Sequence, residues 1–152
     1  MDEKDKKIVQ KTTEELLRVL KVEGTFKLAA IEEESLDIIL ETKDSGIVIG
    51  RHGDVLESLQ LILSLCITKR AGRFIRVSVE VGDYKKNRIE WLKGFAQQTK
   101  EKVLEQNREI AIPNLRSWER RVVHLFLQDD KEVLSESQGE GRDRVLVIKS
   151  RG

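Results

Sequence analysis

The feature that most constrains the fold of this chain is Gly46–Gly53, an apolar run that ends in a short glycine-bracketed loop and leads directly into a helical pattern. Gly50 and Gly53 lack a Cβ, so another backbone can approach the main chain there. The N–H groups in the first turn of the next helix favour an anion. Arg51 and His52 add side-chain donors between the glycines. The loop therefore has the features of a phosphate site, although a helix-starting turn with a solvated tip fits the same residues.

The chain before this loop is predicted to form one helix and two strands. Apolar residues near helical spacing predict an amphipathic helix over Ile8–Val22, ended by Gly24. Alternation predicts strands over Thr25–Ile31 and Leu36–Leu40. The carboxylates of Glu32–Glu34 form the turn between the strands, where we expect them to be solvated rather than part of a metal or acid–base site.

After the loop, an apolar stripe predicts a long helix that begins near Asp54 and ends near Ala71-Gly72. Its predicted buried residues are Val55, Leu56, Leu59, Ile62, Leu63 and Cys66. Phe74–Val81 alternates as a strand does, and its predicted core residues are Ile75, Val77, Val79 and Val81. The order helix, strand, strand, loop, helix, strand predicts a compact α+β unit ending near Gly82.

A second unit follows. Tyr84–Asn107 is the longest helical pattern and is predicted to join the two units. Trp91 and Phe95 on this helix are either base-stacking platforms or core residues, and aromatic residues at helical spacing favour the core. Ile110–Ile112 is a short apolar run, and Pro113 cannot extend a strand ladder.

The next predicted helix runs to about Gln128 and is capped by Asn114 or Ser117. Its inward-packing residues are predicted to be Trp118, Val122 and Leu125.

Basic residues on this helix form a candidate phosphate site. Arg116, Arg120 and His124 recur every four residues and so share one face, with Arg121 beside them. An Arg and a His one turn apart can both donate to a single phosphate. A solvated basic face is the alternative interpretation.

Two strands are predicted to complete the unit, over Lys131–Glu136 and Arg144–Lys149. The polar, glycine-containing segment between them predicts a hairpin turn, where Arg142 and Arg144 add positive charge.

Composition narrows the classes of function. Residues 1–44 carry 8 basic and 12 acidic residues, whereas residues 45–152 carry 20 basic and 15 acidic ones, so the basic excess lies with the loop and everything after it. Cys66 is the only cysteine and there are two histidines, so neither a disulfide framework nor a structural zinc site is expected. No signal peptide or membrane-spanning run is visible, which predicts a soluble cytoplasmic protein.

An enzyme is not predicted. The glycine loop has no Gly-Lys-Ser/Thr sequence, so the nucleotide-binding P-loop pattern fails. His124 has no Ser or Cys nucleophile close to it in the sequence, although partners in space remain open. No catalytic residue, metal or cofactor is predicted.

Two motifs and their order carry a resemblance to a known family. Gly46-Ile-Val-Ile-Gly-Arg-His-Gly-Asp resembles the Gly-x-x-Gly core of a KH domain, and the strands upstream follow the prokaryotic (type II) order. Ser117-Trp-Glu-Arg-Arg-Val-Val-His124, with the later Ser-Gln-Gly-Glu-Gly, resembles the single-stranded nucleic-acid-binding domain named for its Arg-x-x-x-His motif. This arrangement is similar to that of the bacterial Jag family, also called KhpB.

The resemblance implies a type II-like KH domain over residues 1–82 and an Arg-x-x-x-His domain, with a small sheet packed on helices, over residues 83–152. It implies binding of single-stranded RNA, with single-stranded DNA as an alternative ligand. The implied contact residues are Ile49, Gly50, Arg51, His52 and Gly53 in the first domain and Arg116, Arg120, Arg121, His124, Arg142 and Arg144 in the second.

The family also implies a role in post-transcriptional control or as an RNA chaperone, linked to cell elongation and envelope growth, often beside a small single-KH protein. Many members have an additional N-terminal domain associated with a membrane insertase, and this chain begins almost directly at the KH helix, so that association is not carried over. The family typically has two permanently charged residues inside the loop. Here His52 is one of the pair, so loop affinity is expected to fall between about pH 5 and 8. The alternative function is a protein-interaction scaffold at the cell envelope.

Overall fold

The computed structural model describes residues 1–152, which divide into two compact units, Met1–Lys85 and Lys86–Gly152. Each unit has its own three-stranded sheet and its own hydrophobic core, so the predicted α+β class is confirmed. No helix combines the length and the apolar character that crossing a bilayer requires.

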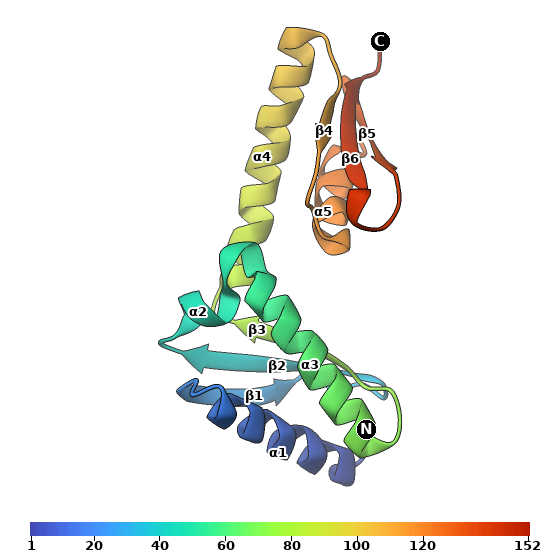
Figure 1. Cartoon of the computed structure of the whole chain (residues 1–152). Helices are drawn as coiled ribbons and strands as arrows, with labels where there is room; N and C mark the ends of the chain where they lie inside the picture. Colours follow the sequence, from blue (N-terminus) through green and yellow to red (C-terminus); the bar gives the residue numbers. More distant parts are fainter. The chain divides into compact units, whose positions relative to one another are not determined.

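The first unit is a sheet with two helices on one face (Figure 1). Its elements in chain order are α1 (Glu3–Val19), β1 (Gly24–Ala29), β2 (Ser35–Thr42), α2 (Ser45–Ile49), η1 (Arg51–Gly53), α3 (Asp54–Ala71) and β3 (Arg76–Val81). β2 is central, antiparallel to β1 and parallel to β3. The parallel pair requires a crossover connection, which α2 and α3 provide.

The predicted alternation of β2 and β3 is confirmed. Every second residue of each strand is buried against α1 and α3, and Ile75, just before β3, continues the pattern. The buried strand residues are Leu36, Ile38, Leu40, Val77, Val79 and Val81. Burying one such aliphatic side chain fully stabilises the folded state by roughly 1.5–3 kcal/mol, so this layer supports the loop between α2 and α3.

The buried stripe of α3 is narrower than predicted. Its core residues are Leu56, Leu59, Leu63 and Ile67. Val55 and Ile62 are 46% and 45% exposed, and Cys66 is only partly buried, so the prediction was wrong for these three. A helix packed on one sheet buries one stripe, and apolar residues outside that stripe stay in contact with solvent.

Two element boundaries also differ from the prediction. The apolar run before Gly50 forms the short helix α2, in which Val48 is buried. α1 ends at Val19, well before Gly24, because Lys21 adopts a left-handed φ of 55° that stops the helix. Gly24 opens β1 instead.

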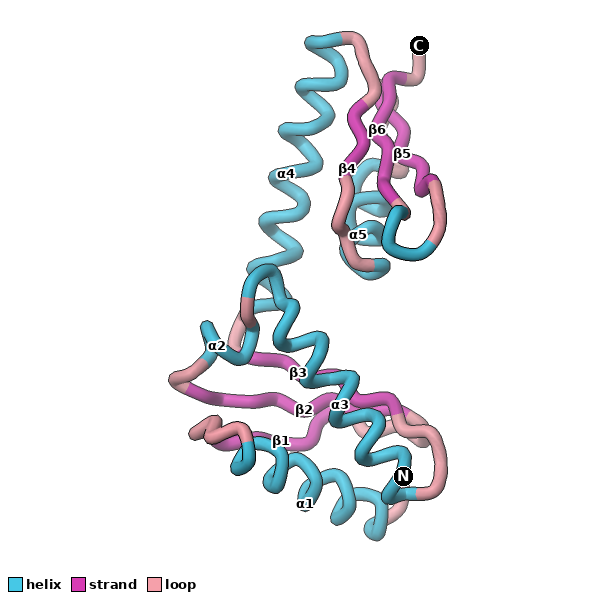
Figure 2. The backbone as a smooth tube through the Cα atoms, in the orientation of Figure 1, coloured by secondary structure: helices cyan, strands magenta, loops and turns pink.

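The second unit packs a sheet against α4 (Tyr84–Gln106), whose first residues belong to the first unit, and α5 (Ser117–Leu127). Its other elements are β4 (Ile110–Ile112), β5 (Val133–Gln138), η2 (Gly141–Asp143) and β6 (Val145–Ser150). β6 is central and antiparallel to both neighbours (Figure 2). The core comprises Leu92, Ala96, Val103, Ile112, Leu115, Val123, Leu127, Val133, Leu146 and Ile148.

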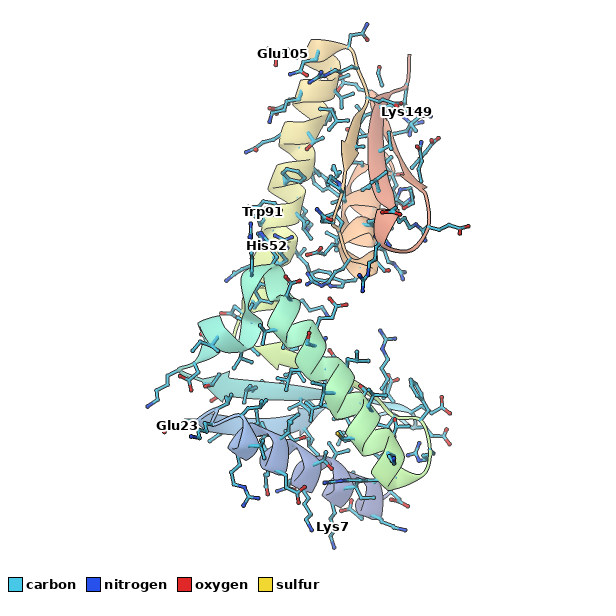
Figure 3. The ribbon with its side chains drawn as sticks, viewed as in Figure 1. Lys7, Glu23, His52, Trp91, Glu105 and Lys149 are labelled. Atoms are coloured by element: carbon cyan, nitrogen blue, oxygen red, sulfur yellow. The ribbon has the colours of Figure 1, made fainter.

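The aromatic residues of α4 are divided between the core and the surface. Phe95 is partly buried against the second core, as predicted, but Trp91 is 51% exposed, so its core assignment was wrong (Figure 3). The two rings stack with centroids 5.1 Å apart, and the guanidinium carbon of Arg88 lies 4.5 Å from the Trp91 ring centroid. The protein itself therefore supplies two stacking partners of Trp91.

A buried carboxylate fixes the start of α5. Neither Asn114 nor Ser117 is the N-cap; that position is Arg116, whose backbone N–H donates to Oε2 of Glu119 at 2.9 Å. The other oxygen of this fully buried carboxylate accepts from Nε of Arg88 at 2.8 Å. A glutamate at the third helical position commonly reaches back in this way. The sequence pattern did not predict it because a single Glu among charged residues resembles a solvated one.

We predict that Glu119→Gln strongly destabilises the chain. Removing the charge leaves the Arg88 guanidinium buried without its ion pair, which typically costs about 3–5 kcal/mol. Urea denaturation of the full chain measures the change in the free energy of unfolding. Glu136→Gln is the matched control, because its pair with Lys149 lies at the surface and should contribute less than about 1 kcal/mol. Equal effects of the two substitutions would contradict the structural role of Glu119.

Two aspartates are held in hydrogen-bonded ion pairs. Asp5 accepts from Arg73 at 2.7 Å, and this hydrogen bond lowers the pKa of Asp5 below its ordinary value. Asp130 accepts from Nζ of Lys100 at 2.7 Å, and that bond lowers the pKa of Asp130. Asp130 also accepts from the backbone N–H groups of Glu132 and Val133, which ties the start of β5 to α4.

Because both pKa values are lowered by folding, the stability that these carboxylates contribute is present above the ordinary aspartate pKa of about 3.9 and is lost as the pH falls through the lowered values. We expect Asp130→Asn to reduce the urea midpoint at neutral pH and to flatten its fall on acidification. Asp129→Asn, at an exposed neighbour, should change neither. Parallel pH profiles of wild type and Asp130→Asn would contradict this account.

Candidate nucleic-acid interface

The loop between α2 and α3 has an unusual backbone. Gly50, His52 and Gly53 have φ values of 69°, 52° and 80°, all in the left-handed region. That region is costly for residues other than glycine, so His52 is held there by the turns on either side. Arg51 and His52 are both exposed, and Figure 3 labels His52 at this loop. The backbone thus presents the two basic residues at the tip.

The glycines are required by the protein's own packing. A Cβ on Gly50 would lie 2.4 Å from Cγ2 of Val55, and a Cβ on Gly53 would lie 2.8 Å from Oη of Tyr84. Gly53 is buried. The expectation that the missing Cβ atoms open a path for another backbone is therefore corrected: the space where each Cβ would stand is already occupied by Val55 or Tyr84.

The charge around the loop is mixed. Asp54 and Glu57 lie in the first turn of α3 and are exposed, directly after Arg51 and His52. Carboxylates at a helix N-terminus stabilise the helix but repel a phosphate. Ile49 is partly buried against the first core and so offers only part of its surface to a ligand. The loop is consequently a weaker anion site than its glycine spacing suggests.

In the second unit, the predicted row of basic residues on α5 is shorter than expected. Arg116 precedes the helix, in extended backbone with φ −69° and ψ 161°, and its guanidinium lies 3.9 Å from the buried Glu119 carboxylate. Its side chain is only 18% exposed. Arg116 is therefore part of the structure at the start of α5, and the helical row consists of Arg120 and His124.

Arg120 combines two roles. Its guanidinium donates to the backbone carbonyl of Leu115 and to Oγ of Ser117, which closes the turn before α5. A guanidinium carries five N–H donors, so some remain for a ligand. The two protein bonds hold the planar group in one orientation, and a pre-oriented fork loses less entropy on binding an anion.

His124 is exposed and is held by one hydrogen bond. Its Nδ1 lies 2.7 Å from Oγ of Ser135, a residue of β5 that is 8% exposed. No residue of the protein is hydrogen-bonded to Nε2. No direct signal in the sequence indicates this pair, because Ser135 lies in the segment predicted to lead into the hairpin turn. It was therefore not among the predicted site residues.

The remaining predicted residues lie at the surface. Arg121 on α5, Arg142 in η2 and Arg144 just before β6 are all exposed. Leu125 is 49% exposed, so its predicted inward packing was wrong, while Trp118 and Val122 pack partly against the second core. The exposed side of α5 thus combines Arg121, His124 and an apolar residue.

The site has the chemistry of anion binding. No cluster of three or more His, Cys, Asp or Glu residues could hold a metal ion. The proximity of Ser135 and His124 resembles a nucleophile–base pair, but the serine is buried and its partner is Nδ1. In a hydrolytic triad the serine meets Nε2 and a carboxylate orients Nδ1. The pair is therefore built to hold the imidazole.

Known families match both units. The KH domain of KhpA/KhpB matches residues 6–81, and the domain named for its Arg-x-x-x-His motif matches residues 90–150. RNA-binding protein KhpB of Clostridium symbiosum is 34% identical over 116 residues, which cover 76% of this chain and 52% of that protein. RNA-binding protein KhpB of Streptococcus pneumoniae serotype 2 is 32% identical over 114 residues, covering 75% of this chain and 35% of that protein.

RNA-binding protein KhpB of Bacillus subtilis is 28% identical over 106 residues, which cover 68% of this chain and 51% of that protein. The chain spans about half, or less, of the length of these curated relatives. The KH match covers half of the chain, the Arg-x-x-x-His match follows it in order, and both agree with the α+β units described above. The chain belongs to the KhpB family, also called the Jag family, in which a KhpA/KhpB-type KH domain precedes an Arg-x-x-x-His domain.

Proposed function

We propose that this chain is a non-enzymatic RNA-binding protein of the cytoplasm, with one single-strand site at residues 49–53 and a second on α5. The observation that carries the proposal is the pair of donor sets, one in each unit. Arg51 and His52 are exposed at a left-handed glycine loop, and Arg120 and His124 lie one turn apart with donors to spare. Relatives of this chain carry the name RNA-binding protein.

The first site would hold the nucleic-acid backbone. A KH loop clamps about four nucleotides, and here Arg51 and His52 would donate to phosphate oxygens beside the first turn of α3. The acidic pair Asp54 and Glu57 makes this contact weak by itself. Weak binding favours ligands that also reach a second site.

The second site would hold a neighbouring single-stranded segment. The guanidinium of Arg120 and Nε2 of His124 can donate to one phosphate, with Arg121, Arg142 and Arg144 adding sequence-independent attraction. Because both sites belong to one chain, binding at one raises the effective concentration of RNA at the other. The combined affinity then exceeds that of either site.

The cellular role follows from family membership alone. We include in the proposal a function as a post-transcriptional regulator or RNA chaperone linked to cell elongation and envelope growth, with a small single-KH protein as partner. Residues 1–82 and 83–152 would act as the two binding domains.

The KH-loop contact predicts that Arg51→Asp combined with His52→Asp lowers affinity for single-stranded RNA by about tenfold or more, because two donors become negative charges against phosphate. Fluorescence anisotropy over a salt series measures the affinity and its salt slope. Lys7→Asp with Lys11→Asp, at exposed positions of α1, is the control with a comparable change in net charge. Equal losses in the two double variants would reduce the loop contribution to net charge alone.

The α5 contact predicts that His124→Ala weakens RNA binding by about tenfold, the typical effect of losing a hydrogen bond to a charged group. Gln128→Ala, one turn further along the chain and also exposed, should bind as wild type does. Thermal unfolding checks that both variants fold. Unchanged affinity and unchanged salt slope in His124→Ala would favour a solvated basic face, the alternative to a binding site.

A further inference from the structure

The hydrogen bond between His124 and Ser135 joins an exposed side chain to a buried one. Ser135 lies in β5 directly opposite Ile148 of β6, so the strand register fixes its position. Its Oγ is 2.7 Å from Nδ1 of His124, and no other hydrogen-bond partner of this hydroxyl is present. One buried group thus determines how the imidazole is held.

The chemistry of the partner decides which ring nitrogen carries the proton. A neutral imidazole has one N–H, and a hydrogen bond at one nitrogen selects the tautomer of the other. A carbonyl or carboxylate at Nδ1 can only accept, which places the proton on Nδ1 and leaves a lone pair on Nε2. That lone pair would repel a phosphate oxygen.

A hydroxyl has no such restriction. It can donate to an unprotonated Nδ1 and can accept from a protonated one. With Ser135 as the donor, the single proton of the neutral ring resides on Nε2, the nitrogen that has no protein partner. The ring then offers a donor to solvent whether it is neutral or charged.

We propose that Ser135 is the positioning residue of the α5 site: its O–H donates to Nδ1 of His124, fixes the ring, and presents Nε2–H to a phosphate oxygen of the RNA. This inference rests on the proposed function, and it assigns the buried serine a role in ligand binding. No covalent step is involved. The hydroxyl makes affinity at this site less dependent on protonation of the ring than an acceptor partner would.

The first test is spectroscopic and needs no RNA. In the full chain labelled with ¹⁵N-histidine, we expect the neutral His124 ring at about pH 8 to carry its proton on Nε2 and to show an Nδ1 signal shifted by an accepted hydrogen bond. His124→Gln identifies the signals against those of His52. In Ser135→Ala the Nδ1 signal should move to that of an unbonded acceptor. A proton found on Nδ1 in the wild type would overturn the proposal.

The second test measures binding. At about pH 8, Ser135→Ala should weaken binding of single-stranded RNA by about fivefold, the usual scale for one neutral hydrogen bond. Ser135→Thr keeps the hydroxyl and should restore both the affinity and the Nδ1 signal. Ser137→Ala, on the same strand and exposed, is the matched control and should have no effect.

The outcomes separate this inference from the proposed function. If His124→Ala weakens binding while Ser135→Ala leaves both the affinity and the Nδ1 signal unchanged, the positioning role is wrong and the binding site stands. If neither variant weakens binding, the α5 site itself is wrong and the inference falls with it. Weakening by Ser135→Ala with rescue by Ser135→Thr supports both.

Discussion

The contact of two glycines with their own protein is the constraint on which the first site depends. Gly50 and Gly53 turn the backbone into the left-handed region, and Val55 and Tyr84 fill the space that a Cβ would need. This packing ties the loop to α3 and to the first residue of α4. A loop fixed in this way presents Arg51 and its neighbour without the entropic cost of ordering them at each binding event.

The second unit applies the same principle through hydrogen bonds. Glu119 holds the start of α5, the carbonyl of Leu115 holds the guanidinium of Arg120, and Ser135 holds the imidazole of His124. Each basic group that faces solvent is oriented by a group at least partly withdrawn from it. Side chains oriented by such support lose less freedom when a ligand binds, which allows a small polar surface to bind an anion usefully.

Much of the fold could be predicted because it follows local periodicity. Alternation indicated the strands of the first unit, and the glycine pattern placed the helix that starts at Asp54. Predictions of which face is buried were less accurate: Trp91 and Leu125 are exposed although their spacing suited a core. Periodicity shows that a helix has an apolar side, but only the packed neighbours decide how wide the buried stripe is.

The groups that support the site could not be predicted from the sequence. Arg120 and His124 were identified from their spacing, and their assignment to RNA binding remains a proposal. Glu119 and Ser135, which orient neighbouring basic groups, were not identified, because a buried carboxylate looks like a surface charge in a sequence and the serine is brought to His124 only by the packing of β5 on α5. Contacts of this kind depend on tertiary structure.

The most direct measurement of the central claim is a titration of the uniformly ¹⁵N-labelled chain with a short single-stranded RNA, followed by backbone amide shifts. Binding at two sites predicts that the largest shifts cluster at residues 49–55 and at residues 117–125, and that an RNA too short to reach both sites perturbs each cluster with weak affinity. Shifts confined to other surfaces, or no shifts with RNA that binds in solution, would contradict the account.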